Sequence, residues 1–391
     1  MRVCYFGTYE RSYPRNKVVI DALRTAGVEV VECHLPLWEL TRHKTGSFFR
    51  LKSLIGLAWR ISWGYLKLIR RYFKQVGDAS IVMVGYIGQL DLLLAWLLTR
   101  TGRRRKLIYN PLVSLYDTLI DDRGLFAQGS LAAKFLFRLD RWSFRLADRI
   151  ILDTDVHIDY ISDKFGIDRE RFERLFVGAD QEAFSPRQIP SGEDPLVVLF
   201  VGKFIPLHGL PDIIEAASQL QGDPGVRFEI VGTGQLYEQI MDLCRRLKVT
   251  NIVFTDWIPY HQLVDKMARA HVCLGIFSQG GKASRVIPNK VFQGLAVGMP
   301  VITGDSPASR ELLTDGQDAL LVPMGDPGAL AEAICSLKKD PQLRLQIAAG
   351  GHSIFLKRCS AEVLGRQLKA LCELTLSHSQ EDGSEIRPAS G

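Results

Sequence analysis

The sequence lacks the marks of a secreted, a zinc-binding or a membrane-spanning protein. Its seven cysteines are scattered, with no CxxC pair and no histidine cluster nearby, so they predict neither a disulfide framework nor a zinc site. The N-terminal MRVCYFGTYE has no basic start with a long apolar run, as a secretion signal would have. No stretch reaches the roughly 18 consecutive apolar residues that cross a bilayer. These absences favour the reducing cytoplasm.

The composition is that of a folded, mildly basic protein. Hydrophobic residues make up 47% and charged residues 24% of the 391 residues, and the formal net charge is +6. A chain of this length is too long for one ordinary hydrophobic core, which predicts two domains.

Short apolar runs alternate with helical segments along both halves of the chain. In the first half the runs are residues 3–6, 28–32, 80–84, 106–110, 149–153 and 174–177. This alternation predicts an α/β fold with parallel, doubly wound sheets. No GxGxxG motif is present, and the loop after Gly7 is only a weak glycine signal.

A change of composition divides the chain. Residues 177–195 are rich in proline and glycine and have no periodic apolar pattern, and the strand–helix alternation restarts at Leu196. We therefore expect a first domain at 1–185, a second at 195–345, helices at 346–376 that pack back towards the first domain, and a disordered tail at 377–391.

One segment has a strong charge asymmetry. Residues 41–77 hold nine lysines and arginines but no acidic residue, and at helical spacing the apolar side chains share one face. Residues 50–74 therefore form either a sheet-covering helix with a solvated basic back or a basic amphipathic helix on an anionic membrane. Nucleic acid is a weaker third alternative, because no nucleic-acid-binding motif accompanies the segment.

Residues 285–303, RVIPNKVFQGLAVGMPVIT, predict a loop, a short helix, a glycine stop and a buried strand. Pro288 suits the first helical turn, and Gly298 suits the left-handed stop. The free amides near Asn289 and Lys290 would then offer a site for an anion such as a diphosphate. The alternative is an ordinary connection with a solvated Asn–Lys pair.

Acidic residues follow the fourth strand-like run, in SLYDTLIDDR. Loops in this position line the cleft of an α/β domain, so Asp117 or Asp122 could act as a base or orient a hydroxyl. Helix caps and a local Asp–Arg pair are an equally good interpretation.

Several motifs, taken in order, resemble the C-terminal half of retaining, GT-B-fold glycosyltransferases of family 4. They are VGADQEAF, FVGKFIPLHGL, FEIVGTGQ, RVIPNKVFQGLAVGMPVIT, SPASRELL and DALLVP. The resemblance covers residues 175–341 well and the first half more loosely. It implies two Rossmann-like domains that face each other across a cleft, a nucleoside diphosphate sugar as donor substrate, and no metal or other cofactor.

The resemblance also assigns a diphosphate site to the second domain. Lys203 and His208, flanked by Gly202 and Gly209, would hold the diphosphate. The family usually has arginine and lysine at the two basic positions, so we expect the charge at His208 to depend on pH.

Other residues would surround the rest of the donor. Gly232 and Gly234 would let the chain approach the nucleotide, and the turn that ends at Ile258 would contact the base. Gly7 and Arg15, in the first loop, would reach the donor when the domains close.

The main departure from the family lies in residues 285–303. The signature pair of glutamates falls on Arg285 and Gln293. Gln293 can still hydrogen-bond the ribose hydroxyls, whereas Arg285 replaces an acceptor by a cation that only donates. An anionic donor sugar, a second clamp on the diphosphate, or lost catalysis would each be consistent with Arg285.

The implied mechanism has no covalent nucleophile. Lys203, Arg285 and the helix start at Asn289 stabilise the departing diphosphate while an acceptor hydroxyl attacks from the same face. Asp117 and Asp122 are the candidates on the acceptor side.

The basic segment and the resemblance together favour a lipid-linked glycan or glycolipid acceptor, met by a cytoplasmic, peripherally bound enzyme at the inner face of the membrane. The alternative is a non-catalytic, nucleotide-sugar-binding or scaffold subunit of a glycan assembly complex. A phosphorylase or epimerase of the same fold is a third hypothesis.

Overall fold

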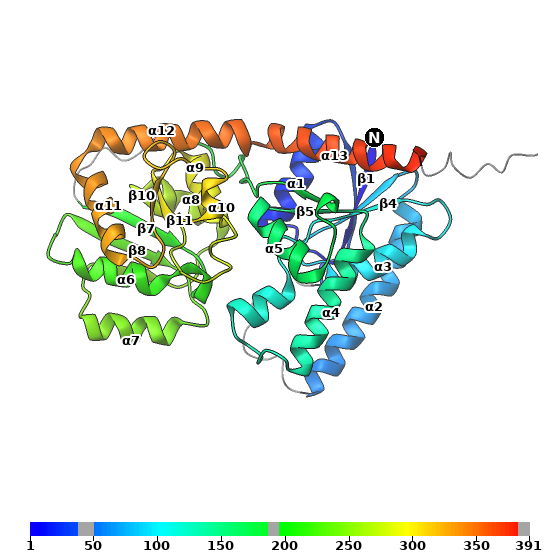
Figure 1. Cartoon of the computed structure of the whole chain (residues 1–391), viewed down its shortest axis with the longest axis horizontal. Helices are drawn as coiled ribbons and strands as arrows, with labels where there is room; N and C mark the ends of the chain where they lie inside the picture. Colours follow the sequence, from blue (N-terminus) through cyan, green and yellow to red (C-terminus); the bar gives the residue numbers. More distant parts are fainter. Residues whose placement is uncertain (38–50, 187–194, 382–391) are drawn as a thin grey trace, which may run out of the picture.

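The computed structural model of the chain describes residues 1–37, 51–186 and 195–381, which form two parallel sheets with helices on both faces of each (Figure 1). The doubly wound α/β fold expected from the sequence is confirmed. The central strands are largely apolar and buried, because helices cover both faces of each sheet, whereas the strands at the edges of both sheets are partly exposed.

The first sheet has the strand order β2-β1-β3-β4-β5-β6, with every neighbouring pair parallel. Its strands are β1 (Arg2–Gly7), β2 (Glu29–His34), β3 (Ile81–Val84), β4 (Lys106–Tyr109), β5 (Arg149–Leu152) and β6 (Phe172–Arg174). A π-helical turn, η1 (Asp117–Asp122), follows β4, and a 3₁₀ turn, η2 (Arg169–Arg171), precedes β6.

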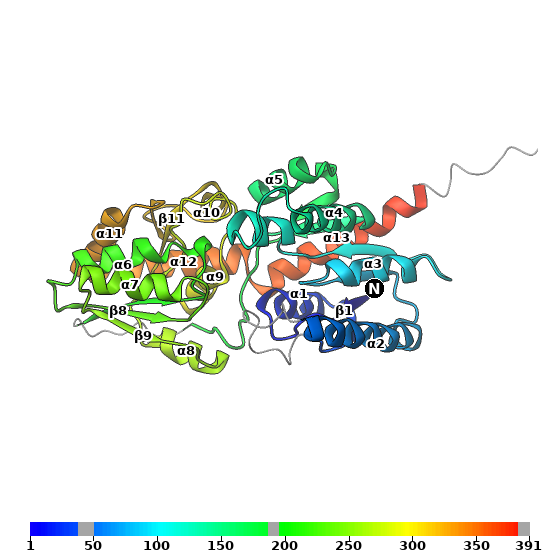
Figure 2. The same ribbon diagram turned by 90° about the horizontal axis from the view of Figure 1, so that it is seen from below.

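The helices of the first domain divide between the two faces of this sheet. One face packs against α1 (Pro14–Thr25) and α13 (Ala361–Glu381). The other packs against α2 (Leu51–Gln75), α3 (Gln89–Thr99), α4 (Leu131–Leu146) and α5 (Asp155–Phe165). Figure 2 shows α2, α3 and α4 side by side across the molecule.

The second sheet has the strand order β12-β11-β10-β7-β8-β9. Its strands are β7 (Leu196–Val201), β8 (Val226–Val231), β9 (Ile252–Thr255), β10 (Val272–Leu274), β11 (Val301–Asp305) and β12 (Leu320–Pro323). One face packs against α6 (Leu210–Gln219), α7 (Tyr237–Leu247) and α11 (Pro327–Lys339), and the other against α8 (Tyr260–Ala268), α9 (Asn289–Val297) and α12 (Pro341–Arg358). The short segments η3 (Pro206–His208) and α10 (Pro307–Arg310) lie in loops after β7 and β11.

The stretch that begins at Arg285 folds largely as its sequence predicts. Gly298 ends α9 in the left-handed conformation, with φ of 78°, and β11 follows. Pro288 is the N-cap of α9, with extended backbone, rather than a residue of the first turn. The helix therefore begins at Asn289, one residue later than expected.

Two passages of the chain join the domains, and they lie side by side. One passage is the segment after β6, and the other is the connection between α12 and α13. The Ala361 amide, in the connection between the helices, donates to Gln181 Oε1, in the segment after β6, at 2.6 Å. Helix α13 continues to Glu381 because Leu371 and Thr375 extend its buried face, so the segment from 377 is helical up to 381. Residues 382–391 of the expected tail lie outside the described residues.

No helix in the described part of the chain is both long and apolar enough to cross a membrane.

Candidate functional site

The carboxyl ends of the second-domain strands face the first domain. Loops leave β7 at Gly202, β8 at Gly232 and β10 at Gly275, and the last of these leads into α9. The side chain of Asn289, at the start of α9, interacts with the hydroxyl of Tyr13 of the first domain. The start of α9 therefore lies at the domain interface, where α/β folds bind ligands.

Lys290, in the first turn of α9, is buried and has no polar partner. Only 5% of its surface is exposed, and Nζ has no hydrogen-bond acceptor among the described residues. The amine lies 3.6 Å from the centroid of the Phe200 ring. Burial lowers the pKa of Lys290 well below its usual value. The alternative of a solvated Asn–Lys pair is therefore wrong for the lysine.

His208 and Gly202 lie next to this amine. A Cβ on Gly202 would come within 3.0 Å of Lys290 Nζ and 2.8 Å of His208 Cε1. His208 Nδ1 donates to the Lys203 carbonyl at 2.6 Å, because a carbonyl can only accept. Burial, and then the charge of Lys290, lower the pKa of His208 well below its usual value. In this arrangement the surroundings of His208 favour its neutral form. The Lys203 side chain is exposed.

Gly232 and Gly234 make close contacts within the protein. A Cβ on Gly232 would lie 1.9 Å from the Gly202 carbonyl oxygen, and one on Gly234 would lie 2.8 Å from backbone atoms of Phe204. Gly232 also has a φ of +144°. These glycines let the loops after β7 and β8 pack together, and their expected role at the nucleotide stays a prediction.

Gln293 and Ile258 lie on the same side of the second domain. Gln293 is buried in α9, and its side chain interacts with the hydroxyl of Tyr260. Ile258 is partly buried against the core beside α8, while the neighbouring Trp257 is exposed.

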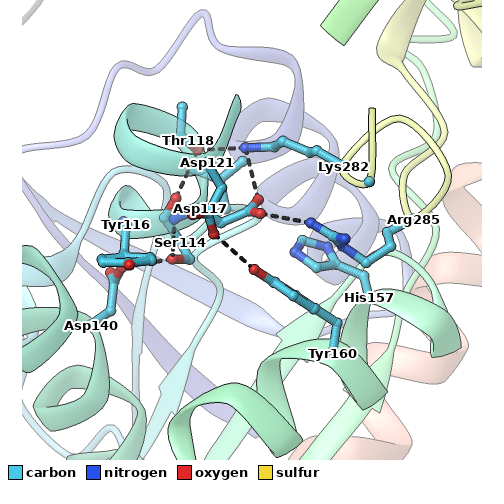
Figure 3. Close-up of polar contacts among 12 residues, drawn as sticks. Ser114, Tyr116, Asp117, Thr118, Asp121, Asp140, His157, Tyr160, Lys282 and Arg285 are labelled. Atoms are coloured by element: carbon cyan, nitrogen blue, oxygen red, sulfur yellow. Dashed lines mark hydrogen bonds and ion pairs between the residues drawn. The ribbon is translucent and has the colours of Figure 1, made fainter. Parts of the chain in front are cut away.

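Asp117 and Arg285, both catalytic candidates, form an ion pair across the domain interface (Figure 3). Arg285 Nη2 donates to Asp117 Oδ1 at 2.7 Å, and Lys282 Nζ lies 3.1 Å from Asp117 Oδ2. The guanidinium carbon of Arg285 lies 3.6 Å from the centroid of the Tyr160 ring. This is not the local Asp–Arg pair considered from the sequence, because Arg285 lies 168 positions away in the second domain.

Asp117 has no exposed surface, and this alone would raise its pKa. The charges of Lys282, His157 and Arg285 outweigh burial, and the net effect lowers the pKa of Asp117. In this arrangement Asp117 is a paired carboxylate and not a free base.

Asp122 lies at the end of the same π-helical turn and is partly buried. Burial raises its pKa, and the nearby backbone amide of Leu207 in the second domain acts in the opposite direction. Asp122 thus faces the loop that carries His208.

Arg15 and Gly7 make their contacts within the first domain, and their expected roles towards the donor stay predictions. Arg15 is fully buried, where its guanidinium donates to Asn110 Oδ1 at 2.8 Å and to the carbonyls of Leu175 and Phe176. It thereby joins α1 to the end of β4 and to the segment after β6. Gly7, with φ of +136°, makes room for the buried Asp91, which the Thr8 amide contacts at 2.7 Å.

The interface contains residues that the sequence did not single out. The Thr154 hydroxyl donates to the Arg285 carbonyl at 2.5 Å, and Glu311 accepts from the backbone amides of Asp155 and Val156 at 2.8 and 2.9 Å. Lys282 also donates to Thr118 Oγ1 at 2.5 Å. No local pattern marks such residues, because each depends on a partner in the other domain.

Comparisons with known proteins agree with this architecture. Residues 195–340 match the family model described as "Glycosyl transferases group 1". This group 1 match contains Lys203, His208, Lys290 and Gln293.

Two curated relatives bear names of the same kind. The chain is 28% identical over 230 residues to "Lipopolysaccharide core biosynthesis glycosyltransferase LpsE" of Rhizobium meliloti, covering 56% of this chain and 63% of the relative. It is 29% identical over 263 residues to "D-inositol 3-phosphate glycosyltransferase" of Acidothermus cellulolyticus, covering 61% and 57%. The chain thus matches less than two thirds of the length of either relative.

Solved structures share the whole fold. Sucrose-phosphate synthase from Thermosynechococcus elongatus superposes with a TM-score of 0.71 at 15% identity, covering 97% of this chain and 100% of that one. HepE of Anabaena, solved with UDP-glucose, superposes with a TM-score of 0.69 at 16% identity, with the same coverage. The chain therefore has the GT-B fold, as its sequence predicts.

Proposed function

We propose that this protein is a retaining glycosyltransferase of family 4. In this proposal it moves a sugar from a nucleoside diphosphate sugar to a hydroxyl of a lipid-linked glycan or glycolipid at the cytoplasmic face of the membrane. The observation that carries the proposal is the buried, unpartnered amine of Lys290 at the start of α9, within the region that matches the group 1 model.

A buried, charged amine without a partner is unfavourable, because burial removes its hydrogen bonds to water and no protein acceptor replaces them. A diphosphate beside Lys290 would supply the missing counter-charge and restore the charged form. The free amides of the first turn of α9 and the helix dipole favour the same anion. The exposed Lys203, on the loop after β7, would close the site from the other side.

In the proposed transfer, the bond between the sugar carbon and the diphosphate loosens first. Lys203, Lys290 and the start of α9 stabilise the charge that develops on the leaving diphosphate. The acceptor hydroxyl attacks from the face that the diphosphate leaves, which retains the configuration. Gln293, released from Tyr260, would hydrogen-bond the ribose.

The outer side of α2 supports a membrane-bound acceptor. Leu68 and Tyr72 pack against the sheet, so α2 does cover it. Three large apolar side chains nevertheless face outward, together with basic residues. The apolar ones are Trp63, Leu66 and Phe73, and the basic ones are Lys67, Arg70, Arg71 and Lys74.

Helix α4 adds a second stripe of the same kind. Leu131, Phe135 and Trp142 are 86%, 60% and 56% exposed, and the exposed charged residues of α4 are all basic. The two acidic residues within α2, α3 and α4, Asp91 and Asp140, are both buried. A layer with outward apolar side chains, basic charge and no outward acid complements an anionic bilayer.

The proposal is tested by nucleoside diphosphate release from a panel of UDP-, GDP- and dTDP-sugars, with and without bacterial lipid extract and in EDTA. We expect release from one donor, dependent on lipid and insensitive to EDTA. Release should fall in Lys290→Met and Lys203→Ala, and not in the control Lys339→Met, which removes an exposed lysine of α11. Release that stops in EDTA would refute the absence of a metal requirement. Release that is equal with and without lipid would refute the lipid-linked acceptor.

A non-catalytic binding subunit is the second candidate. The Arg285 side chain forms an ion pair with Asp117 of the first domain instead of facing its own, second domain. It predicts nucleotide binding that depends on Lys290, without turnover of any donor.

A further inference from the structure

Arg123, at the end of the π-helical turn η1, is an arginine at the domain interface without an ion-pair partner. Its backbone carbonyl accepts a hydrogen bond from Gln235 Nε2 of the second domain at 3.0 Å. Its guanidinium forms no hydrogen bond or ion pair with any residue that the structure describes, and Nε is shielded from solvent. The guanidinium stays charged, because arginine is not deprotonated in proteins, and a shielded donor without a partner is unfavourable.

The acids of η1 do not neutralise Arg123 by direct contact. Lys282 and Arg285, which also reach across the interface, both pair with the carboxylate of Asp117. The charge of Arg123 acts on Asp122, its neighbour in the sequence, but the two side chains form no ion pair. Within the described part of the chain, Arg123 is therefore a cation that lacks an anion.

The charge of Arg123 reaches the second domain at His208. Burial, then the charge of Lys290 and then that of Arg123 lower the pKa of His208. The same ring lies beside the Lys290 amine, because a Cβ on Gly202 would come within 3.0 Å of Lys290 Nζ and 2.8 Å of His208 Cε1. Arg123 and Lys290 thus act on one buried ring from opposite domains.

Two tyrosines connect Arg123 to the start of α9. Burial raises the pKa of Tyr86, and the charge of Arg123 opposes this rise. The Tyr86 ring stacks on the Tyr13 ring with centroids 4.1 Å apart, and the Tyr13 hydroxyl interacts with the side chain of Asn289. Arg123 therefore acts on two groups, His208 and Tyr86, that flank the start of α9 on different sides.

An anion with two phosphates suits this arrangement. Lys290 and the amides of the first turn of α9 would hold it from the second domain. Arg123 would bind it from the first domain, and a planar guanidinium binds phosphate oxygens with pairs of N–H groups. The ligand would supply the anion that both side chains lack.

We propose that Arg123 is the first-domain binding residue for the diphosphate of the donor. The proposal rests on the proposed function, which identifies the ligand, and adds to it a contact from the opposite domain. Both domains are then needed to bind the donor fully, since Lys290 and Arg123 lie on different ones.

Calorimetry tests this contact with the nucleoside diphosphate that the release panel selects and with the corresponding nucleoside. Arg123→Met should raise the dissociation constant of the diphosphate about 10- to 100-fold and leave that of the nucleoside unchanged, because only phosphates are contacted. Arg123→Lys, which keeps the charge but loses the paired N–H groups, should lie between the two. Arg141→Met is the matched control, because Nε of Arg141 in α4 is also shielded and unpartnered among the described residues, while its guanidinium lies near Gly166 within the first domain.

Equal diphosphate affinities of the wild type and Arg123→Met would overturn the proposal. An equal loss of nucleoside affinity would also overturn it, because the change would then disturb the whole site. A wild type that binds no nucleotide would refute the proposed function, and inorganic pyrophosphate then becomes the probe. Pyrophosphate binding that weakens in Arg123→Met and Lys290→Met, but not in Arg141→Met, would support an anion site between the domains. Absent pyrophosphate binding, or binding that is unchanged in Arg123→Met, would overturn it.

Discussion

Replacing Lys290 by methionine should change stability and ligand affinity in opposite directions. Methionine keeps the length of the side chain and its contact with the Phe200 ring while it removes the buried amine. An unsatisfied buried donor costs about 1–3 kcal/mol, so the ligand-free variant should be more stable by that order. For a domain of this size the transition temperature should rise by about 2–4 °C for each kcal/mol.

The same change should weaken nucleoside diphosphate binding. A charge-assisted hydrogen bond contributes about 1.5–3 kcal/mol, which corresponds to a roughly 10- to 150-fold increase in the dissociation constant. Calorimetry on the wild type, Lys290→Met and the surface control Lys339→Met measures this directly.

The pH dependence of stability gives an independent check. The folded-state pKa of Lys290 lies well below that of the unfolded chain, so the unfolded state binds more protons between the two values. Wild-type stability should therefore rise with pH up to about 10.5, and this slope should be smaller in Lys290→Met. A variant that melts lower than the wild type, or that binds nucleotide equally well, would refute the assignment of Lys290.

The remaining predictions concern the interface, a buried acid and the outer helices. Glu311→Gln replaces the carboxylate that accepts from two α5 amides by a weaker acceptor, so the free energy of unfolding should fall by about 1 kcal/mol in thermal unfolding. An unchanged transition temperature would contradict a stabilising role for these hydrogen bonds. Burial raises the pKa of Asp140 to about 6, so its contribution to stability falls as pH rises from about 3.8 to 6; Asp140→Asn should remove that part of the slope in denaturant titrations. Changing Phe135 and Trp142 to serine should reduce sedimentation with anionic vesicles several-fold without changing nucleotide affinity, and equal sedimentation would exclude α4 from the membrane surface.

The sequence predicts the parts of this molecule that depend on local pattern. Alternating apolar runs predict the strands of both sheets, and Gly298 marks the end of α9, because backbone geometry and one-sided burial leave a periodic trace. The segment predicted at 50–74 contains α2, of which Leu68 and Tyr72 pack on the sheet while Phe73 of the predicted apolar face is exposed.

Contacts between distant residues leave no such trace. Asp117 and Arg285 are 168 positions apart, and neither flanking sequence specifies the other. Lys290 looks solvated on a helical wheel, yet α9 is buried all round, since it lies between the second sheet and α12. His157 looks like part of a polar helix face, and only the fold places it beneath the interface.

The last helix has a consequence for how the protein folds during synthesis. Leu364, Leu368 and Leu371 of α13 complete the core against Val19 and Leu23 of α1. A ribosome adding about 5–20 residues per second needs roughly 10–40 s to pass from the end of the first sheet to this helix. During that time the face of α1 that packs against α13 stays uncovered, so the first domain completes its core only after the second domain has been made.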